Sequence, residues 1–142
     1  MTTDEIVKHT FCDVWDDTLK KYKITPTSQV FPRGYVLGGQ PGAGKSYLNE
    51  LANERCYKNI VIINADDFRK YHPNYKEYQM QYGKDSPKFT SEYSGKMAEA
   101  ILNKAISSRY NVVIEGTFRT SETPIKTLTK MKDNGYKTEV LI

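Results

Sequence analysis

The chain has 142 residues, with 21 Lys and Arg against 17 Asp and Glu, two cysteines and 38% hydrophobic residues. This length suits one globular domain, because such a chain buries roughly two-thirds of the surface that its unfolded form exposes. The net charge of +4 is too small to predict nucleic-acid binding. No apolar run approaches the ~20 residues of a membrane-spanning helix, and charged side chains interrupt the N-terminal segment, unlike a secretory signal. We therefore expect a cytoplasmic protein that binds neither membrane nor nucleic acid, with Cys12 and Cys56 as free thiols.

The first predicted element is a helix over residues 3–22. Thr2, with Glu5 three residues later, is typical of a capping box at the start of a helix. Apolar side chains then recur at helical spacing, at Val7, Phe11, Val14, Trp15, Leu19 and Tyr22. This spacing predicts one continuous apolar face along the helix.

Strand-like and helix-like segments alternate through the rest of the chain. The predicted strands cover residues 35–37, 59–63, 111–114 and 137–142, and the predicted helices cover residues 45–54, 91–106 and 124–134. For the last helix, Thr123 is the expected cap, Pro124 the first-turn proline and Gly135 the stop. Ile125, Leu128 and Met131 follow the cap and the proline in this predicted helix. The polar, tyrosine-rich stretch around His72 and Pro73 is assigned no element.

This alternation predicts an α/β fold of the P-loop NTPase type, in which helices flank a parallel sheet. We expect a single domain, with the N-terminal helix 3–22 and a nucleotide-binding core over residues 33–142. An apolar last strand with no helix after it leaves one sheet face uncovered. The expected domain is therefore truncated after its fourth strand, or a partner supplies the missing layer.

A glycine-rich segment behind the first predicted strand fits the pattern G-x-x-x-x-G-K-[ST] in full. It consists of Gly39, Gln40, Pro41, Gly42, Ala43, Gly44, Lys45 and Ser46. Glycines let successive backbone N–H groups point at phosphate oxygens, and the positive end of the following helix adds to their attraction. We expect Lys45 to reach the β- and γ-phosphates of ATP, Ser46 to hold Mg²⁺ through its hydroxyl, and the adjoining Tyr47 to complete the nucleotide site.

Two carboxylates follow the second predicted strand, at the sheet edge where the phosphate loop also lies. An Asp at this point can accept the proton of an attacking hydroxyl, or it can cap the next helix. Position alone leaves both roles open. We assign the catalytic base to Asp66 and the cap to Asp67.

The third predicted strand is followed by Glu115, with Arg119 close behind it. A glutamate directly after a buried strand is costly to bury without a partner. Glu115 is therefore expected to hold magnesium through water or to accept hydrogen bonds from a substrate. Arg119 is expected to bind a phosphate in a bidentate manner.

Taken together, these motifs resemble the zeta toxin family of bacterial toxin–antitoxin systems. The resemblance spans residues 30–142 and rests on three segments behind the phosphate loop. These are Asn64-Ala65-Asp66-Asp67-Phe68-Arg69 running into His72-Pro73, the helix segment 96–101, and Ile114-Glu115-Gly116-Thr117-Phe118-Arg119-Thr120 with Pro124-Ile125. The phosphate loop is common to many kinases, whereas the other segments are much narrower in their distribution.

The resemblance implies an ATP-dependent kinase that phosphorylates the 3′-hydroxyl of the amino sugar in UDP-N-acetylglucosamine and so blocks peptidoglycan synthesis. It implies that Lys45 stabilises the transferred phosphate and that Asp66 is the base. The positions that it implies for the sugar-nucleotide site are Glu99, Glu115, Thr117, Arg119 and Thr127. It also implies a small antitoxin that packs near the N-terminal helix and blocks ATP. The apolar face of that helix could serve this partner or pack on the chain's own domain, and we expect the second.

Two alternatives remain open from the sequence. One is a P-loop kinase for another small molecule, with the same base, Asp66. The other is an ATP-binding or interaction fragment without catalysis, because family members are longer and supply further arginines from their C-terminal half. The absence of a guanine-reading signature disfavours a regulatory NTPase.

Overall fold

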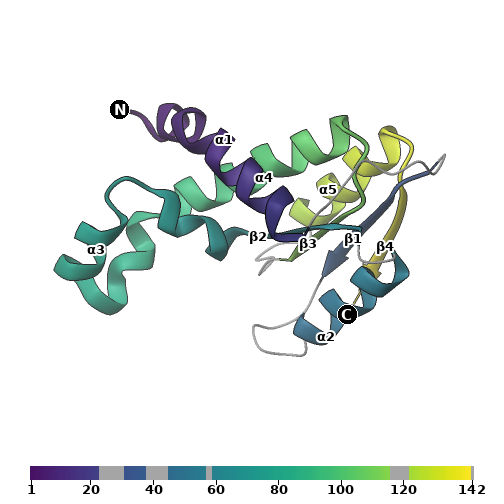
Figure 1. The fold of residues 1–142 in the computed structure, drawn as a ribbon, viewed down its shortest axis with the longest axis horizontal. Coiled ribbons are helices and arrows are strands. Elements are labelled where there is room, and N and C mark those ends of the chain that lie inside the picture. Colours follow the sequence, from purple (N-terminus) through teal and green to yellow (C-terminus); the bar gives the residue numbers. More distant parts are fainter. Residues whose placement is uncertain (23–30, 38–44, 57–58, 116–121, 142) are drawn as a thin grey trace.

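The structure, a computed structural model, describes residues 1–22, 31–37, 45–56, 59–115 and 122–141 (Figure 1). In chain order the elements are α1 (Thr3–Tyr22), β1 (Arg33–Leu37), α2 (Lys45–Arg55), β2 (Val61–Asn64), the 3₁₀ helix η1 (Ala65–Tyr71), α3 (Tyr75–Tyr82), the 3₁₀ helix η2 (Gly83–Phe89), α4 (Ser91–Ser107), β3 (Val112–Glu115), α5 (Glu122–Asp133) and β4 (Lys137–Leu141). The predicted strands and helices are all present. The second strand begins two residues later than predicted, and the tyrosine-rich stretch, which was assigned no element, is helical.

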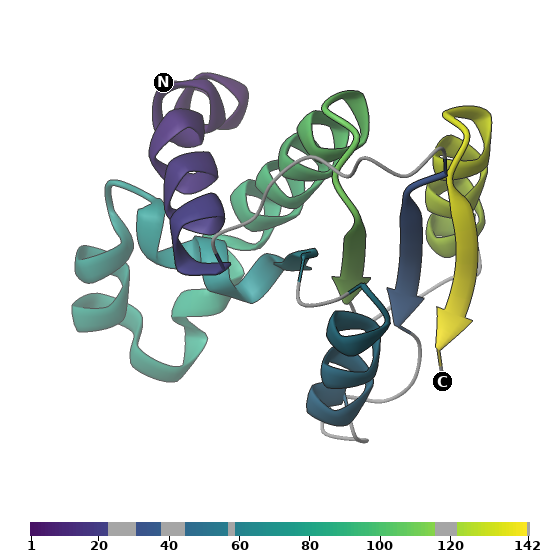
Figure 2. The ribbon, with the colours of Figure 1, turned by 45° about the vertical axis from the view of Figure 1, so that its right-hand side comes forward.

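The strands form a four-stranded parallel sheet with the order β2-β3-β1-β4 (Figure 2). The register pairs Leu37 with Glu115 and with Leu141, and it pairs Glu115 with Asn64. Parallel pairing and this register bring the carboxyl ends of the strands to one edge of the sheet. The predicted α/β class with a parallel sheet is confirmed.

Helices cover both faces of the sheet. The helices α1, α4 and α5 lie on one face and α2 lies on the other (Figure 1). Val61, Ile63 and Val112 are buried toward α4, while Tyr35 and Val113 are buried toward α2. Strands covered on both sides are rich in apolar residues throughout, which explains the continuous apolar runs in the sequence.

Helix α1 packs on the chain's own domain, as expected. The backbone N–H of Glu5 donates to Thr2 Oγ1 over 3.2 Å, which confirms the predicted cap. Val14 and Trp15 are buried, and the Trp15 ring meets Tyr110 edge-on with centroids 5.5 Å apart. Phe11 packs against the same core, whereas the side chain of Tyr22 lies outside the described part of the chain.

One expectation about α5 is wrong. The helix begins at Glu122, so Thr123 lies within its first turn and is not the cap. Pro124 is tolerated there because first-turn N–H groups have no helical partner to lose. Thr127 and Met131, one turn apart, are the residues that face the sheet, which leaves Ile125 59% exposed.

Two glycines act at the C-terminal end of α5. A Cβ atom on Gly34 of β1 would lie 2.3 Å from Met131 Sδ, so only glycine allows this approach. Just after the helix Gly135 has φ of +81°, and this left-handed conformation ends the helix as predicted.

The sequence also predicted that the chain has no membrane-spanning helix and that its two cysteines are free thiols. Within the described ranges, no helix has the length and apolar character needed to cross a bilayer. Cys12 is exposed and Cys56 is buried, and both are free thiols as expected.

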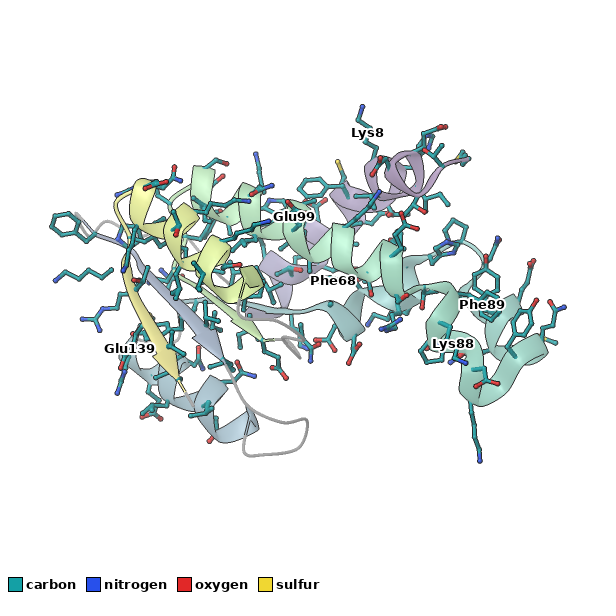
Figure 3. All side chains as sticks on the ribbon, turned by 180° about the vertical axis from the view of Figure 1, so that it is seen from behind. Lys8, Phe68, Lys88, Phe89, Glu99 and Glu139 are labelled. Carbon is teal, nitrogen blue, oxygen red and sulfur yellow. The ribbon has the colours of Figure 1, made fainter. Side chains whose placement is uncertain are left out.

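Residues 75–89, which form α3 and η2, project from the body of the molecule and are called the helical lobe here (Figures 1 and 3). No residue of α3, all of which is described, is buried. Stacked rings hold the lobe together, with centroids 4.0 Å apart for Tyr82 and Phe89 and 5.3 Å apart for Tyr78 and Phe89. Because few apolar side chains are buried in it, the lobe depends on specific contacts at its base.

One of these contacts is made by His72, which is 8% exposed. Its ring meets Tyr93 of α4 edge-on at 5.0 Å and also contacts Tyr78 of the lobe. His72 Nδ1 accepts a hydrogen bond from the backbone N–H of Asn74 over 3.0 Å, which requires an unprotonated Nδ1. Burial lowers the pKa of His72 from its ordinary value of 6.5.

We predict that His72 makes the protein less stable in acid. The unfolded chain takes up this proton at higher pH than the folded chain, so the contribution of His72 is present above pH 6.5 and is lost as pH falls below it. Urea unfolding at pH 7.5 and 5.5 should show a smaller loss of stability for His72→Asn than for the unsubstituted protein. The exposed His9 provides the control, and His9→Asn should keep the full loss. Equal pH dependence in all three proteins would contradict the prediction.

Candidate functional site

The site is built at the carboxyl edge of the sheet. Leu37, Asn64 and Glu115 end three adjacent strands in register, so the segments that follow them start side by side. Helix α2 begins at Lys45, directly behind the predicted phosphate loop, and therefore directs its positive end toward that edge. Residues 39–44 and the side chains of Lys45, Ser46 and Tyr47 lie outside the described part of the chain.

Asn64 caps the 3₁₀ helix that carries the two aspartates. Its Oδ1 accepts the backbone N–H of Asp66 over 3.0 Å, and its own backbone is extended, with φ of −128° and ψ of 116°. The assignment of the cap to Asp67 is therefore wrong. Asparagine caps as well as aspartate does, and Asn64 comes first along the chain, at the end of the strand.

The two aspartates lie in different surroundings. Asp67 lines an open groove of about 420 Å³ between η1 and the end of α1. In that groove Tyr71 donates its hydroxyl hydrogen to Asp17 Oδ2 over 2.6 Å. Burial, assisted by Asp17, raises the pKa of Tyr71 to about 12, so this hydroxyl stays a donor at neutral pH.

Asp66 instead bonds to Arg69, three residues further along η1. Arg69 Nε donates to Asp66 Oδ1 over 3.1 Å. The guanidinium reaches further, since its Nη1 donates to the Pro87 carbonyl over 2.7 Å and to Thr90 Oγ1 over 3.0 Å. Our sequence reasoning gave Arg69 no role of its own, although the i, i+3 spacing of opposite charges is a known signal for an ion pair.

Glu115 bonds to a residue that the sequence reasoning missed. Asn49 of α2 donates through Nδ2 to Glu115 Oε2 over 2.6 Å. Asn49 lies three residues after Ser46, and this i, i+3 spacing from the phosphate-loop serine was the available signal. Among the described residues, the buried Asn49 Oδ1 has no hydrogen-bond partner. A buried acceptor of this kind fits a donor supplied by a bound ligand or its water.

The remaining predicted site residues fall on α4, α5 and the segment behind β3. Glu99 is exposed on α4 (Figure 3), and Thr127 is 8% exposed on α5. Lys130 Nζ donates to Asn103 Oδ1 over 2.6 Å, one turn beyond Thr127 and Glu99 on their respective helices. Both residues therefore lie near the middle of their helices, on the sides of α4 and α5 that approach each other. Thr117 and Arg119 lie outside the described residues.

Comparison with known proteins connects this geometry to a family. The model of the family described as zeta toxin matches residues 16–142. The chain belongs to the zeta toxin family. The toxin PezT of Streptococcus pneumoniae serotype 4 is 44% identical over 111 residues, which cover 78% of this chain and 44% of PezT. The toxin zeta of Streptococcus agalactiae is 41% identical over 111 residues, which cover 78% of this chain and 39% of that toxin.

Solved structures agree with the zeta toxin assignment. A chain from the structure of the PezAT chromosomal toxin–antitoxin system of Streptococcus pneumoniae has a TM-score of 0.87 and 38% identity, over 99% of this chain and 57% of that chain. A putative kinase from Chloroflexus aurantiacus has a TM-score of 0.51 at 12% identity over 77% of this chain, and this supports the fold alone. The chain thus spans about two-fifths of the length of the curated zeta toxins that it matches.

The Asn49–Glu115 contact generates a prediction for this family member. Asn49→Asp places two carboxylates at hydrogen-bond distance, so we expect it to lower the free energy of unfolding by about 1–3 kcal/mol. Adding Glu115→Gln restores a donor–acceptor pair with the roles exchanged, and should recover most of that loss. Urea unfolding at neutral pH measures both effects.

The exposed neighbour Glu50 supplies the matched control, and Glu50→Gln should change stability little. A double variant Asn49→Asp/Glu115→Gln that is no more stable than Asn49→Asp would show that the two side chains do not interact.

Proposed function

We propose that this chain is the phosphate-transferring core of an ATP-dependent kinase that acts on the 3′-hydroxyl of the amino sugar in UDP-N-acetylglucosamine. The observation that carries the proposal is the register of β1, β2 and β3. It brings Glu115, the start of the Asp66 segment and the strand end that precedes the predicted phosphate loop to one edge of the sheet. Ligands of open α/β sheets bind at this edge. Membership of the zeta toxin family supports the choice of reaction.

ATP would be held at the start of α2. The loop Gly39–Gly44 would offer backbone N–H groups to the phosphates, Lys45 would contact the transferred phosphate, and Tyr47 would adjoin the nucleotide. The chain also offers oxygen ligands suited to Mg²⁺, namely the Ser46 hydroxyl and, through water, Glu115. The unpartnered, buried Asn49 Oδ1 fits the same site, because it needs a donor and metal-bound water is one. When bound, Mg²⁺ neutralises charge on the β- and γ-phosphate oxygens.

Asp66 would act as the base. Its carboxylate side chain is 75% exposed at the edge, and Arg69 bonds to its Oδ1. The carboxylate takes the proton of the sugar hydroxyl while that oxygen forms a bond to the γ-phosphorus. The bond from the γ-phosphorus to the β,γ-bridging oxygen breaks, and ADP leaves with the electron pair. For the sugar nucleotide we propose contacts from Glu99, Glu115, Thr117, Arg119 and Thr127.

We also propose that an antitoxin neutralises this chain by packing near α1 and blocking ATP. The similar chain of known structure comes from a toxin–antitoxin system. The inner face of α1 is occupied by the chain's own core, so the outer face is what such a partner would contact. Lys8 projects from that face (Figure 3). A cytoplasmic location suits an enzyme that uses ATP.

The test is to incubate the chain with Mg·ATP and UDP-N-acetylglucosamine and to detect the added phosphate by mass spectrometry. Asp66→Ala should lower kcat by about 10²–10⁴-fold and leave ATP affinity within a few fold, since it removes a base and no phosphate contact. Lys45→Ala should weaken ATP binding itself. Asp67→Ala is the matched control and should stay within a few fold of the unsubstituted chain.

Each failure has its own meaning. Full transfer by Asp66→Ala would refute the assignment of the base. Transfer to other small molecules but not to UDP-N-acetylglucosamine would leave a P-loop kinase of different specificity. ATP binding without transfer to any acceptor would identify an ATP-binding fragment.

A further inference from the structure

We propose that Arg69 is a positioning residue for this phosphoryl transfer. Its guanidinium fixes the carboxylate of Asp66 by tying it to the helical lobe and to the start of α4. The inference rests on the proposed function, because it takes Asp66 to be the base. The inference goes beyond the proposed function by assigning a role to Arg69 and to the helical lobe.

The guanidinium is anchored and the carboxylate is not. The Arg69 side chain is 21% exposed and donates to three acceptors, which are Asp66 Oδ1, the Pro87 carbonyl and Thr90 Oγ1. The Asp66 side chain is 75% exposed. Because the guanidinium is planar, its bonds to Pro87 and Thr90 fix the direction in which Nε points. The arginine therefore determines where the carboxylate lies.

Thr90 shows that the contact is specific. It is the N-cap of α4 and is 2% exposed, yet its hydroxyl makes no capping bond to that helix. A capping threonine normally accepts an N–H from the first turn, which stabilises the helix by about 1 kcal/mol. Here the hydroxyl accepts from Arg69 instead. The same hydroxyl donates to the Pro87 carbonyl over 3.4 Å, so the two acceptors that anchor Arg69 are themselves joined.

A base on a short helix needs such a support. Asn64 fixes the backbone of Asp66 through its N–H, but this bond does not orient the carboxylate. A general base must come within about 2.6–3.2 Å of the proton that it takes. Arg69 occupies Oδ1, and within the described part of the chain no hydrogen bond is made by Oδ2, which stays available to the substrate hydroxyl.

The support extends into the helical lobe. Pro87 belongs to η2, two residues before Phe89, whose ring stacks on Tyr82 with centroids 4.0 Å apart. The carbonyl that anchors Arg69 is therefore held by the packing of the lobe. The lobe acts on the base from outside the phosphate-binding elements.

Steady-state kinetics with UDP-N-acetylglucosamine tests the proposal. We expect Arg69→Met to lower kcat at least tenfold and to leave the KM for ATP within about threefold, because no phosphate contact is removed. The kcat of Arg69→Lys should lie between those of the unsubstituted chain and Arg69→Met, since an ammonium group keeps the positive charge but lacks the planar arrangement of donors. Lys70→Met is the matched control. It removes a positive charge at the next residue, which lies over the Tyr71 ring, and should leave kcat unchanged.

The double variant separates positioning from a general loss of structure. If Arg69 acts through Asp66, Arg69→Met should cause no further loss of kcat in the Asp66→Ala background. A multiplicative loss, or an unchanged kcat in folded Arg69→Met or Arg69→Lys protein, would overturn the proposal.

A second readout needs no turnover. The ¹H–¹⁵N NMR signal of Arg69 Nε–H should exchange slowly with water in the unsubstituted chain and rapidly in Asp66→Ala. Rapid exchange in the unsubstituted chain would overturn the positioning role. Absence of product from the unsubstituted chain, with the slow signal present, would count against the proposed function alone.

Discussion

The pairing of β3 with both β1 and β2 places the ends of three strands in one row, at Leu37, Glu115 and Asn64. Leu37 is followed in the chain by the predicted phosphate loop, Glu115 itself ends β3, and Asn64 is followed by the 3₁₀ helix that carries Asp66. A shift of register along any one strand would move its segment by about 3.3 Å per residue, which is more than the tolerance of a proton transfer. The buried apolar residues of the strands fix this register, so the core determines the geometry of the edge.

Two polar contacts then connect this row of strand ends to helices on opposite sides of the sheet. Asn49 joins Glu115 to α2, and Arg69 joins Asp66 to the start of α4. The exposed ion pair between Arg69 and Asp66 contributes little to stability by itself, because water screens it. The ion pair instead fixes the position of the Asp66 carboxylate. Arg69 also donates to the Pro87 carbonyl and to Thr90 Oγ1, and these two bonds orient the guanidinium.

The sequence predicted the features that depend on apolar periodicity, namely the strands and the buried face of α1. It did not predict which of several nearby partners a polar side chain would bond. Continuous apolar runs located β1, β2 and β3, and the spacing of Val14 and Trp15 predicted which face of α1 is buried. The cap of η1 was misplaced because β2 runs one residue further than predicted, which makes Asn64, and not Asp67, the residue at the helix start. The helical lobe was missed because Tyr78 and Tyr82 stack on Phe89 near the surface, and no residue of α3 is buried, so the sequence shows no apolar stripe there. The contact between Arg69 and Thr90 joins residues 21 apart, and no local pattern encodes it.

The elements that would bind nucleotide and those that would hold the base are different parts of the fold. The phosphate loop lies between β1 and α2, whose packing belongs to the core cluster containing Tyr35, Leu37 and Leu48. Asp66 depends on η1, Arg69 and a lobe with little buried surface of its own. Local opening is easiest where few apolar contacts are buried, so the lobe can loosen without disturbing the cluster beneath α2. Loosening of the lobe would free Arg69 and with it the carboxylate of Asp66, while the packing of β1 and α2 was kept. Under the proposed function, nucleotide affinity and transfer rate would therefore be separable, because the contacts of Arg69 would affect transfer alone.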